Sequence, residues 1–403
     1  MIYDLIIAGG GAAGFFTAIN VATQNPELTI LIIEKGKEVL TKVKVSGGGR
    51  CNVTHGEFIP KELSKNYPRG EKELIGPFHT FMTGDTMEWF ENKGVALKIE
   101  EDGRVFPVSD SSQTIIDCFV KEAKERKVTV VKGQLIKDFG QEETLWKVVT
   151  NKEVFFSKKM MVATGSNQKI WEILKKLNHT IVPSVPSLFT FNIADKRIKE
   201  LPGVVANAEV KIQGQKLTSE GPLLITHWGM SGPAILKLSS WGALVLHDLG
   251  YSFTIEVNWL PGYTRKDVIE ELKGFKEECA KQLVYKYARF ELPKRLWRSF
   301  VNAAGIVDTM RWADVNKSQL SQLASEVVES VYSVDGKSTF KEEFVTAGGV
   351  DLKEVSFKTY ESKKNKNLYF AGEVLNIDAI TGGFNFQNAW TGAYIAAQAI
   401  AKQ

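Results

Sequence analysis

The hydrophobic pattern at the start of the chain predicts a strand, a helix and a second strand. Residues 4–8 and 29–33 are short, mostly apolar runs, and a glycine turn followed by a segment from about Ala12 to Gln24 lies between them. Short apolar runs bounded by turn residues are typical of buried strands, whereas the longer segment has the length of a helix. The order is that of a βαβ unit.

The pattern changes character along the chain. The apolar strand in "KKMMVATGS" ends at residues 163–165, and "TIIDCFVKEAKERKV" has apolar residues at positions 115, 116, 119, 120 and 123 on one helical face. From about Ser187 to Val345, strand-like pieces come first and helices follow, expected at Arg265–Ala288 and Ser318–Val331. We therefore predict a discontinuous domain, residues 1–186 and 346–403, that holds an inserted substrate domain, residues 187–345.

Three glycines at the first strand-to-helix junction carry the first candidate chemistry. Gly9, Gly11 and Gly14 form G-x-G-x-x-G, and Glu34 follows Gly14 by 20 positions. In this pattern the glycines permit a tight turn, close approach of a pyrophosphate and helix–strand packing, while the acid holds the adenosine ribose. The helix N-terminus offers free N–H groups to the anion. The pattern predicts dinucleotide binding; the alternative is a purely structural turn.

A second glycine-rich stretch, "VKVSGGGRCNVTH", follows the second strand at residues 43–55. Such a stretch could be a linker, a phosphate cradle, a redox thiol or a metal clip. Backbone N–H groups of Gly47–Gly49 can point at phosphate oxygens, and Lys42 or Arg50 can neutralise their charge. We interpret the stretch as a cradle on the phosphate side of the dinucleotide.

Composition narrows the class of protein. The chain has 403 residues, 43% apolar and 24% charged, and a formal net charge of +4, which is too small to argue for nucleic acid by itself. No segment approaches the roughly 20 apolar residues of a membrane span, and the first residues do not read as a secretory signal. We therefore expect a cytoplasmic protein that does not enter a membrane.

The three cysteines predict neither a disulfide framework nor a metal site, because their number is odd and no CxxC pair is present. Cys118 and Cys279 fall in apolar patterns typical of a core. Cys51 has no second cysteine five residues later, where flavin disulfide reductases carry one; Gly56 occupies that place. We interpret Cys51 as a packing residue, in preference to a reactive thiolate or a metal ligand.

Three longer motifs, "SGGGRCNVT", "THWGMSGPAIL" and "AGEVLNIDAITGGFNFQNAW", make the chain similar to the two-domain bacterial flavoproteins of the NAD(P)/FAD-dependent oxidoreductase family. The match covers nearly the whole sequence. The resemblance implies an α/β fold with a glutathione-reductase-like, doubly wound FAD-binding domain and an inserted mixed β-barrel plus helical substrate domain. It also implies FAD as the cofactor, with the last helix aimed at the flavin ring.

The expected cofactor-binding residues come from five separate segments of the chain. They are Gly9, Gly11, Ala12, Ala13, Gly14, Glu34, Lys35, Lys42, Ser46, Gly47, Gly48, Gly49, Arg50, Cys51, Asn52, Ala163, Thr164, Gly165, Gly372, Glu373, Asn376, Gly382, Gly383, Phe384 and Asn385.

The redox partner is less defined by the sequence than the flavin site. A second G-x-G-x-x-G with its own βαβ unit would mark a separate NAD(P)H domain, and none is present. NAD(P)H and substrate would then use one face of the flavin in turn, or the substrate would reduce the flavin and oxygen would reoxidise it. His227, at a turn in "THWGMSGPAI", is the candidate proton carrier; the alternative is a histidine that hydrogen-bonds its own loop.

Three functions remain open from the sequence. The leading one is an NAD(P)H-dependent FAD reductase acting on a polarised double bond of a small molecule. The second is an FAD oxidase of a small amine or amino ketone that produces hydrogen peroxide. The third is an RNA-binding flavoprotein in which the basic run from Lys281 to Arg298, with Tyr285, Tyr287, Phe290 and Trp297, contacts nucleic acid. A small-molecule substrate is favoured over nucleic acid, and the oligomeric state is not predicted.

Overall fold

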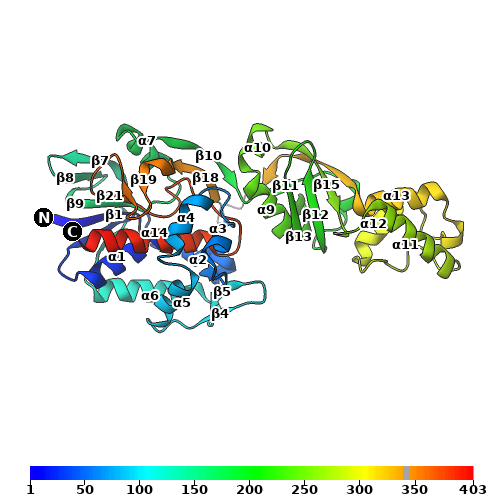
Figure 1. Cartoon of the computed structure of the whole chain (residues 1–403), viewed down its shortest axis with the longest axis horizontal. Coiled ribbons are helices and arrows are strands. Elements are labelled where there is room, and N and C mark those ends of the chain that lie inside the picture. The colour runs from blue at the N-terminus through cyan, green and yellow to red at the C-terminus, as the bar shows by residue number, and fades with distance from the viewer. Residues whose placement is uncertain (339–344, 403) are drawn as a thin grey trace. The chain divides into compact units, whose positions relative to one another are not determined.

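The computed structural model describes residues 1–338 and 345–402. The chain forms two compact units, Met1–Val185 with Lys341–Gln403, and Pro186–Phe340 (Figure 1). Strand β10 (Ile181–Ser187) leads out of the first unit and pairs with β18 (Val345–Val350), which returns to it. Among the described residues, no helix is both long and apolar enough to cross a membrane.

The first unit is built on a sheet with a parallel centre. Strands β1 (Ile2–Ala8), β2 (Ile30–Ile33), β6 (Thr129–Val131), β9 (Val154–Val162) and β21 (Leu368–Phe370) lie in the order β21-β9-β1-β2-β6. Ala8 is level with Ile33 on one side and with Val162 on the other. Because parallel strands end at the same edge, the loops that follow β1, β2, β9 and β21 gather at this edge, where α/β sheets bind ligands.

The sheet extends beyond this centre at the β9 side. β7 (Ile136–Glu142) and β8 (Leu145–Thr150) pair antiparallel and join β9, and β19 (Val355–Ser356) and β20 (Glu361–Ser362) continue from β21. A separate small sheet contains β3 (Thr54–His55), β5 (Arg104–Pro107) and β4 (Leu97–Ile99). Shorter helices complete the unit: α2 (Thr41–Gly49), α3 (Pro60–Ser64), α4 (Glu71–Phe78), α5 (Thr83–Glu91) and α7 (Gln168–Lys176).

Helices α1 (Ala12–Gln24), α14 (Phe384–Ala401) and α6 (Ser112–Glu125) form the main helical layer of the first unit (Figure 1). The bounds of α1 are those that the sequence predicts. The apolar face predicted for α6 is confirmed at Ile115, Phe119 and Ala123, which are buried, whereas Val120 is 45% exposed. Aromatic rings join the layer, because Phe119 contacts both Phe16 and Trp390.

A buried histidine fastens the end of α7 to the segment before β20. His179 Nδ1 lies 2.9 Å from Glu354 Oε2, and its Nε2 lies 3.0 Å from Ser362 Oγ. Burial lowers the pKa of His179 despite the carboxylate. Burial alone would raise the pKa of Glu354, but hydrogen bonds from Lys364, Thr180 and His179 outweigh it and lower that pKa to about 2.

The second unit contains a closed antiparallel barrel. Its strands run in the order β16-β15-β12-β13-β14-β11-β17, and β16 (Ser330–Asp335) and β17 (Lys337–Ser338) are separated only by Gly336. The two ends of the sheet are therefore one bent strand, which closes the barrel. The strand pairs described in this unit are all antiparallel. The barrel is therefore not mixed in strand direction, although the unit combines strands with helices. The remaining strands are β11 (Thr190–Asn192), β12 (Val205–Ile212), β13 (Thr218–Thr226), β14 (Gly229–Ser231) and β15 (Ser252–Asn258).

Helices of the second unit occupy the connections of the barrel. They are α8 (Lys196–Lys199), α9 (Pro233–Trp241), α10 (Ala243–Asp248), α11 (Arg265–Glu278), α12 (Lys294–Ala303) and α13 (Lys317–Val328). The expected helix Arg265–Ala288 was too long, since α11 ends at Glu278. The backbone beyond it pairs elsewhere: Trp312 N–H donates to the Gln282 carbonyl at 3.0 Å. The expected helix Ser318–Val331 likewise ends at Val328, before β16 begins.

Candidate cofactor site

The turn after β1 brings the first glycines against the neighbouring strands. Gly9 N–H donates to the Ile33 carbonyl at 2.9 Å, and a Cβ at Gly14 would lie 2.0 Å from the Gly9 carbonyl oxygen. Only glycine at position 14 therefore lets α1 pack this closely on the strand. Ala12 and Ala13 form the first turn of the helix.

The N-terminus of α1 is open on the side away from the strand. Gly11 is the N-cap residue, so no side chain caps the helix, and its first turn holds no acidic residue. A Cβ at Gly11 would meet no atom within 4 Å. The free N–H groups of a helix N-terminus attract anions, and an unobstructed approach at Gly11 fits a pyrophosphate there.

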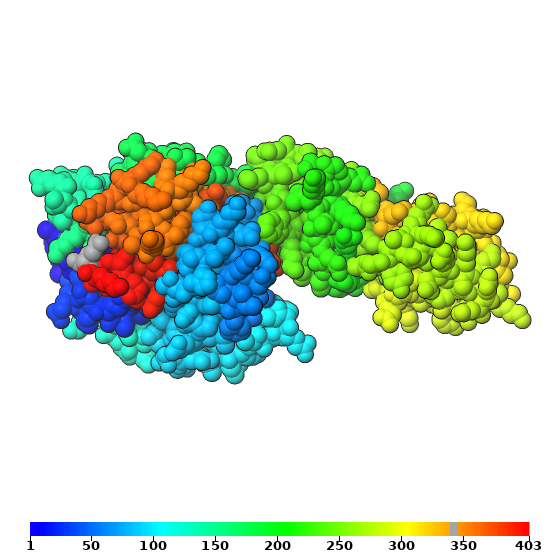
Figure 2. All heavy atoms as spheres, in the orientation of Figure 1, coloured from blue at the N-terminus to red at the C-terminus, as the bar shows by residue number. Residues whose placement is uncertain are grey.

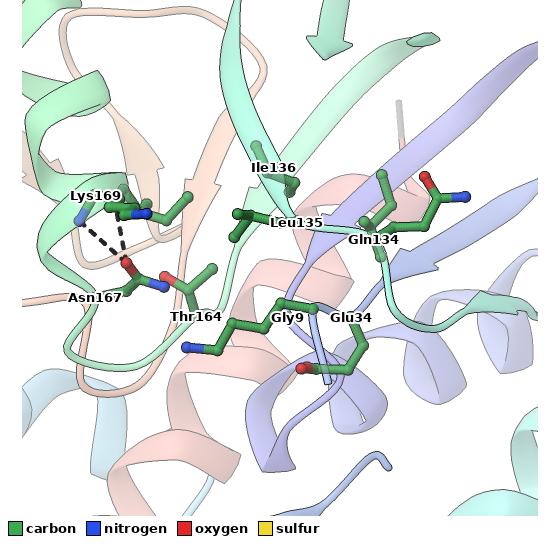
Figure 3. Close-up of a pocket in the computed structure, with 11 residues that line it drawn as sticks. Gly9, Glu34, Gln134, Leu135, Ile136, Thr164, Asn167 and Lys169 are labelled. Atoms are coloured by element: carbon green, nitrogen blue, oxygen red, sulfur yellow. Dashed lines mark hydrogen bonds between the residues drawn. The ribbon is translucent and has the colours of Figure 1, made fainter. Parts of the chain in front are cut away.

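Glu34 lies at the end of β2 and braces two turns. Its carboxylate accepts hydrogen bonds from Gly10 N–H at 2.8 Å and from Gly36 N–H at 2.6 Å. It also lines a pocket at the carboxyl edge of the sheet (Figure 3). The lining residues are Gly9, Ile33, Glu34, Lys35, Gln134, Leu135, Ile136, Thr164, Asn167, Lys169 and Ile170.

The pocket joins residues that the sequence predicts with others that it does not. Glu34, Lys35 and Thr164 were expected, whereas Gln134 comes from the segment before β7 and Asn167 from the start of α7 (Figure 3). Asn167 caps α7 by accepting hydrogen bonds from the N–H groups of residues 169 and 170 at 3.1 and 3.4 Å. An acid at the end of β2 beside apolar walls fits the adenosine half of FAD.

The second glycine-rich stretch lies next to the first turn. Leu40 N–H donates to the Gly10 carbonyl at 2.9 Å, and α2 follows. Helical geometry stops at Ser46, after which Gly47, Gly48 and Gly49 have φ of 57°, 68° and 86°. A Cβ at Gly48 or Gly49 would meet no atom within 4 Å, so the backbone there is accessible to a ligand.

The two basic residues predicted for this stretch lie in different surroundings. Lys42 Nζ is 2.5 Å from Glu373 Oε2, so two predicted site residues that are far apart in the sequence meet. Arg50 instead contacts Glu100 at 2.6 Å and Asp110 at 3.4 Å. Its guanidinium also lies 3.9 Å from the ring centre of Phe106. The charge of Arg50 is thus already matched by carboxylates outside the predicted set.

Cys51 and Asn52 are built into the interior. Cys51 is fully buried, and burial raises the pKa of its thiol to about 12, so it is no thiolate near neutral pH. Asn52 joins the glycine-rich stretch to the start of α14. In the amide orientation that satisfies both partners, its nitrogen donates to the Thr54 carbonyl at 2.9 Å and its oxygen accepts from Gly383 N–H at 3.0 Å.

The loop between β21 and α14 is held at both ends. Gly372 packs beside Ala13 and Ala389, where a Cβ would lie 3.6 and 3.8 Å from theirs. Asn376 accepts a hydrogen bond from Gly348 N–H at 3.1 Å. Asn385 clasps Ala379 with two hydrogen bonds, at 3.1 and 3.3 Å. Contacts within the protein therefore hold this loop in place.

The start of α14 is packed against β3. A Cβ at Gly383 would lie 2.4 Å from the Thr54 carbonyl oxygen, and His55 Nδ1 donates to the Gly382 carbonyl at 3.1 Å. Phe384, the first residue of the helix, accepts from Tyr67 OH at 2.6 Å through its carbonyl. No side chain caps α14, so its N-terminal N–H groups remain available to a ligand.

Sequence reasoning missed the buried groups that brace this loop. Asp378 is fully buried and forms an ion pair with Arg69. Gln387 on α14 accepts from Thr54 Oγ1 at 2.6 Å and from Thr86 Oγ1 at 3.0 Å. No local motif predicts these contacts, because the partners are more than 300 positions apart in the sequence.

The remaining predicted residues are placed as follows. Ala163 and Gly165 flank Thr164 directly after β9, and the Ala163 carbonyl is the group that a Cβ at Gly9 would strike. His227 belongs to the second unit, in the turn between β13 and β14, where its exposed imidazole has no hydrogen bond within the described parts of the chain. The described residues contain no cluster of three metal-ligating side chains.

Comparison with known families identifies the fold and the cofactor class. Residues 3–399 match the family described as HI0933-like protein Rossmann domain. The chain belongs to this family. It is an FAD-dependent oxidoreductase, as the three sequence motifs predict, and the open glycine cradle at Gly11 and Gly48 fits that cofactor. When bound, FAD supplies the electron transfer.

Three curated relatives align over almost their whole length. The ribosomal RNA dihydrouridine synthase of Haemophilus influenzae is 27% identical over 99% of this chain and 98% of its own. The enzyme of the same name from Escherichia coli is 28% identical over 98% and 97%. The 3-dehydro-bile acid delta(4,6)-reductase of Clostridium scindens is 24% identical over 98% of both chains.

Solved structures share the fold of the whole chain. The 3-ketosteroid-delta4-(5alpha)-dehydrogenase of Rhodococcus jostii has a TM-score of 0.52 at 12% identity, covering 100% of this chain and 97% of its own. A flavocytochrome c3 fumarate reductase has a TM-score of 0.51 at 14% identity, covering 100% and 78%. Both similarities concern the architecture, and the predicted fold class is confirmed.

Proposed function

We propose that the protein is an FAD-dependent reductase that uses NAD(P)H to saturate a carbon–carbon double bond conjugated to a carbonyl group. The observation that carries this proposal is the full-length similarity to relatives whose names describe that type of reaction. Dihydrouridine is uridine with its C5–C6 double bond saturated, and a delta(4,6)-reductase saturates ring double bonds. The acceptor in each case is a polarised alkene.

The arrangement of the first unit supports a reductase without a thiol relay. Cys51 is buried and un-ionised, and Cys118 is buried as well, so neither offers a dithiol step. The residues that would hold FAD are those around the N-terminus of α1, the Glu34 pocket and the Gly47–Gly49 turn. The uncapped N-terminus of α14 would stabilise negative charge on a nearby group by its dipole.

A small carbonyl-conjugated alkene is the first candidate substrate, in keeping with the bile acid reductase relative. The uracil ring of RNA is the second, and the names of the two dihydrouridine synthases favour it. Both candidates need the same addition to the alkene, a hydride equivalent that bound FAD would supply at the expense of NAD(P)H and a proton that a side chain or solvent would supply. His227 stays the candidate proton donor for this addition.

Anaerobic mixing tests the proposed reaction. Purified holoprotein is mixed with NADPH or NADH, and the visible absorption of the flavin is followed; we expect prompt bleaching. Addition of a small enone or of a uridine-containing RNA should then restore the oxidised spectrum without oxygen. Bleaching by small amines, with none by NAD(P)H, would instead establish the amine oxidase alternative. Reoxidation that is unchanged in His227→Asn would remove that residue from the mechanism.

A further inference from the structure

The second unit carries a basic surface that the flavin site does not use. Residues 281–317 contain eight basic residues and three acidic ones, whereas the preceding helix α11 contains four basic and five acidic ones. We call six of these residues the basic surface, and all six are exposed. They are Lys281, Lys286, Lys294, Arg298, Arg311 and Lys317. Atoms of this segment, yellow-green to yellow, lie at the surface in Figure 2.

Backbone pairing brings parts of this segment together. The N–H groups of residues 312 and 313 donate to the carbonyls of residues 282 and 280 at 3.0 Å, which sets Arg311 beside the turns of residues 280–284. Helix α12 joins the same stretch, because Trp297 Nε1 donates to the Val284 carbonyl at 2.9 Å. The guanidinium of Arg298 lies 4.9 Å from the ring centre of Tyr285. Cations from three segments therefore share one region.

These cations are unpaired within the described residues. None of the six forms an ion pair or a side-chain hydrogen bond there, unlike Arg289 and Arg295 of the same segment. Arg289 donates to Cys279 Sγ, and Arg295 donates to backbone carbonyls of residues 200 and 202. Two of the eight basic residues thus stabilise the fold, while the others present free charge to solvent.

An exposed tyrosine lies among the cations. Tyr287 is 46% exposed, with Lys286 Nζ 5.5 Å from its ring centre. The expectation that Trp297 contacts nucleic acid was wrong, because it is fully buried in the core of this unit. Phe290 is half-buried and packs on Tyr263 and Phe275. Of the four aromatic residues predicted for this run, Tyr287 is the exposed one, because Tyr285 is also half-buried.

The chemistry of this surface favours one class of partner. The apolar face of α12, including Leu296, Phe300 and Val301, is buried, so this helix has no free apolar face to insert into a lipid surface. Unpaired cations beside an exposed tyrosine match a strand of alternating phosphates and unstacked bases. We infer that the basic surface binds single-stranded RNA, with phosphates on the cations and a base on Tyr287. This inference rests on the second candidate substrate of the proposed function.

Fluorescence anisotropy of a labelled oligouridine with oxidised holoprotein tests the inference. The variant Lys286→Gln/Arg298→Gln removes two cations, and Lys266→Gln/Lys273→Gln removes two exposed cations of α11 as a matched control. Each lost phosphate contact on a single strand makes the slope of log K against log salt concentration shallower by about 0.7. At about 0.1 M salt this corresponds to a roughly fivefold rise in Kd. We expect about 25-fold weaker binding for the first variant and less than about threefold for the control. Tyr287→Ala should weaken binding about fivefold or more, and Tyr287→Phe should restore it.

The outcomes separate the inference from the proposed reaction, because binding is measured without a reductant. RNA binding that depends on Lys286, Arg298 and Tyr287 would stand even if NAD(P)H failed to bleach the flavin. Equal binding by both double variants at unchanged flavin content would overturn the inference while leaving reduction of small enones untouched. Weaker binding of the first variant to anionic lipid vesicles, with RNA binding unchanged, would also overturn it.

Discussion

Gly11→Ala is the substitution that separates cofactor binding from folding. The backbone at Gly11 has φ of −92° and ψ of −167°, an extended conformation that alanine adopts without strain. Its Cβ would meet no protein atom within 4 Å. We therefore expect the free energy of unfolding of the FAD-free protein to change by less than about 1 kcal/mol, the usual cost of alanine at an N-cap.

FAD binding by the same variant should collapse. The methyl group fills the space through which a pyrophosphate reaches the N–H groups of α1, and losing one or two charge-assisted hydrogen bonds costs about 3 kcal/mol. That corresponds to roughly a hundredfold rise in Kd. The assay is titration of FAD-free protein with FAD, followed by flavin fluorescence, alongside urea unfolding.

Gly140→Ala is the matched control, since a Cβ there also meets nothing within 4 Å but lies in β7, away from the α1 turn. It should leave both FAD affinity and stability near those of the unsubstituted protein. If Gly11→Ala bound FAD within about threefold of the unsubstituted protein while remaining folded, the pyrophosphate would not lie at the α1 N-terminus.

Three further predictions concern the first unit. Gly14→Ala sets its methyl carbon 2.0 Å from the Gly9 carbonyl oxygen, so urea unfolding should show a loss of more than about 1 kcal/mol. Cys51→Ala should leave flavin reduction unchanged. In the unsubstituted protein a thiol reagent should modify Cys51 only once the protein is unfolded, because burial raises the pKa of this thiol to about 12. Acidification should destabilise the unit in two steps. Below pH 6.5 the unfolded chain gains a proton at His179 that the folded protein does not take up, and from pH 4.5 toward 2 the same happens at Glu354. Unfolding of Glu354→Gln should lack the second loss of stability.

Local patterns predict the opening βαβ unit well. The strands, the turn and the bounds of α1 follow from short-range signals: apolar runs, glycines at fixed spacing and an acid 20 positions later. The fold class also follows, because the longer motifs mark both ends of the FAD domain. The signals of the βαβ unit can be seen in a single sequence because each depends on near neighbours, whereas the longer motifs indicate the fold class through the family resemblance.

Contacts between segments that are distant in the sequence could not be predicted from it. The charge of Arg50 suggests a phosphate partner, yet it contacts Glu100, which follows β4, and Asp110, which follows β5. Asn167 and Gln134 line the pocket only because their segments end at the same edge of the parallel sheet. Helix α11 stops ten residues early for the same kind of reason, since its expected continuation pairs with the backbone near Arg311.

The central claim is that the first unit holds FAD between segments from the N-terminal and C-terminal parts of the chain. Its most direct test is the visible spectrum of the purified full-length chain, with the released cofactor quantified after denaturation. We predict a yellow protein that carries stoichiometric FAD, or that takes it up when the cofactor is added. A colourless protein that also fails to bind added FAD would contradict the account.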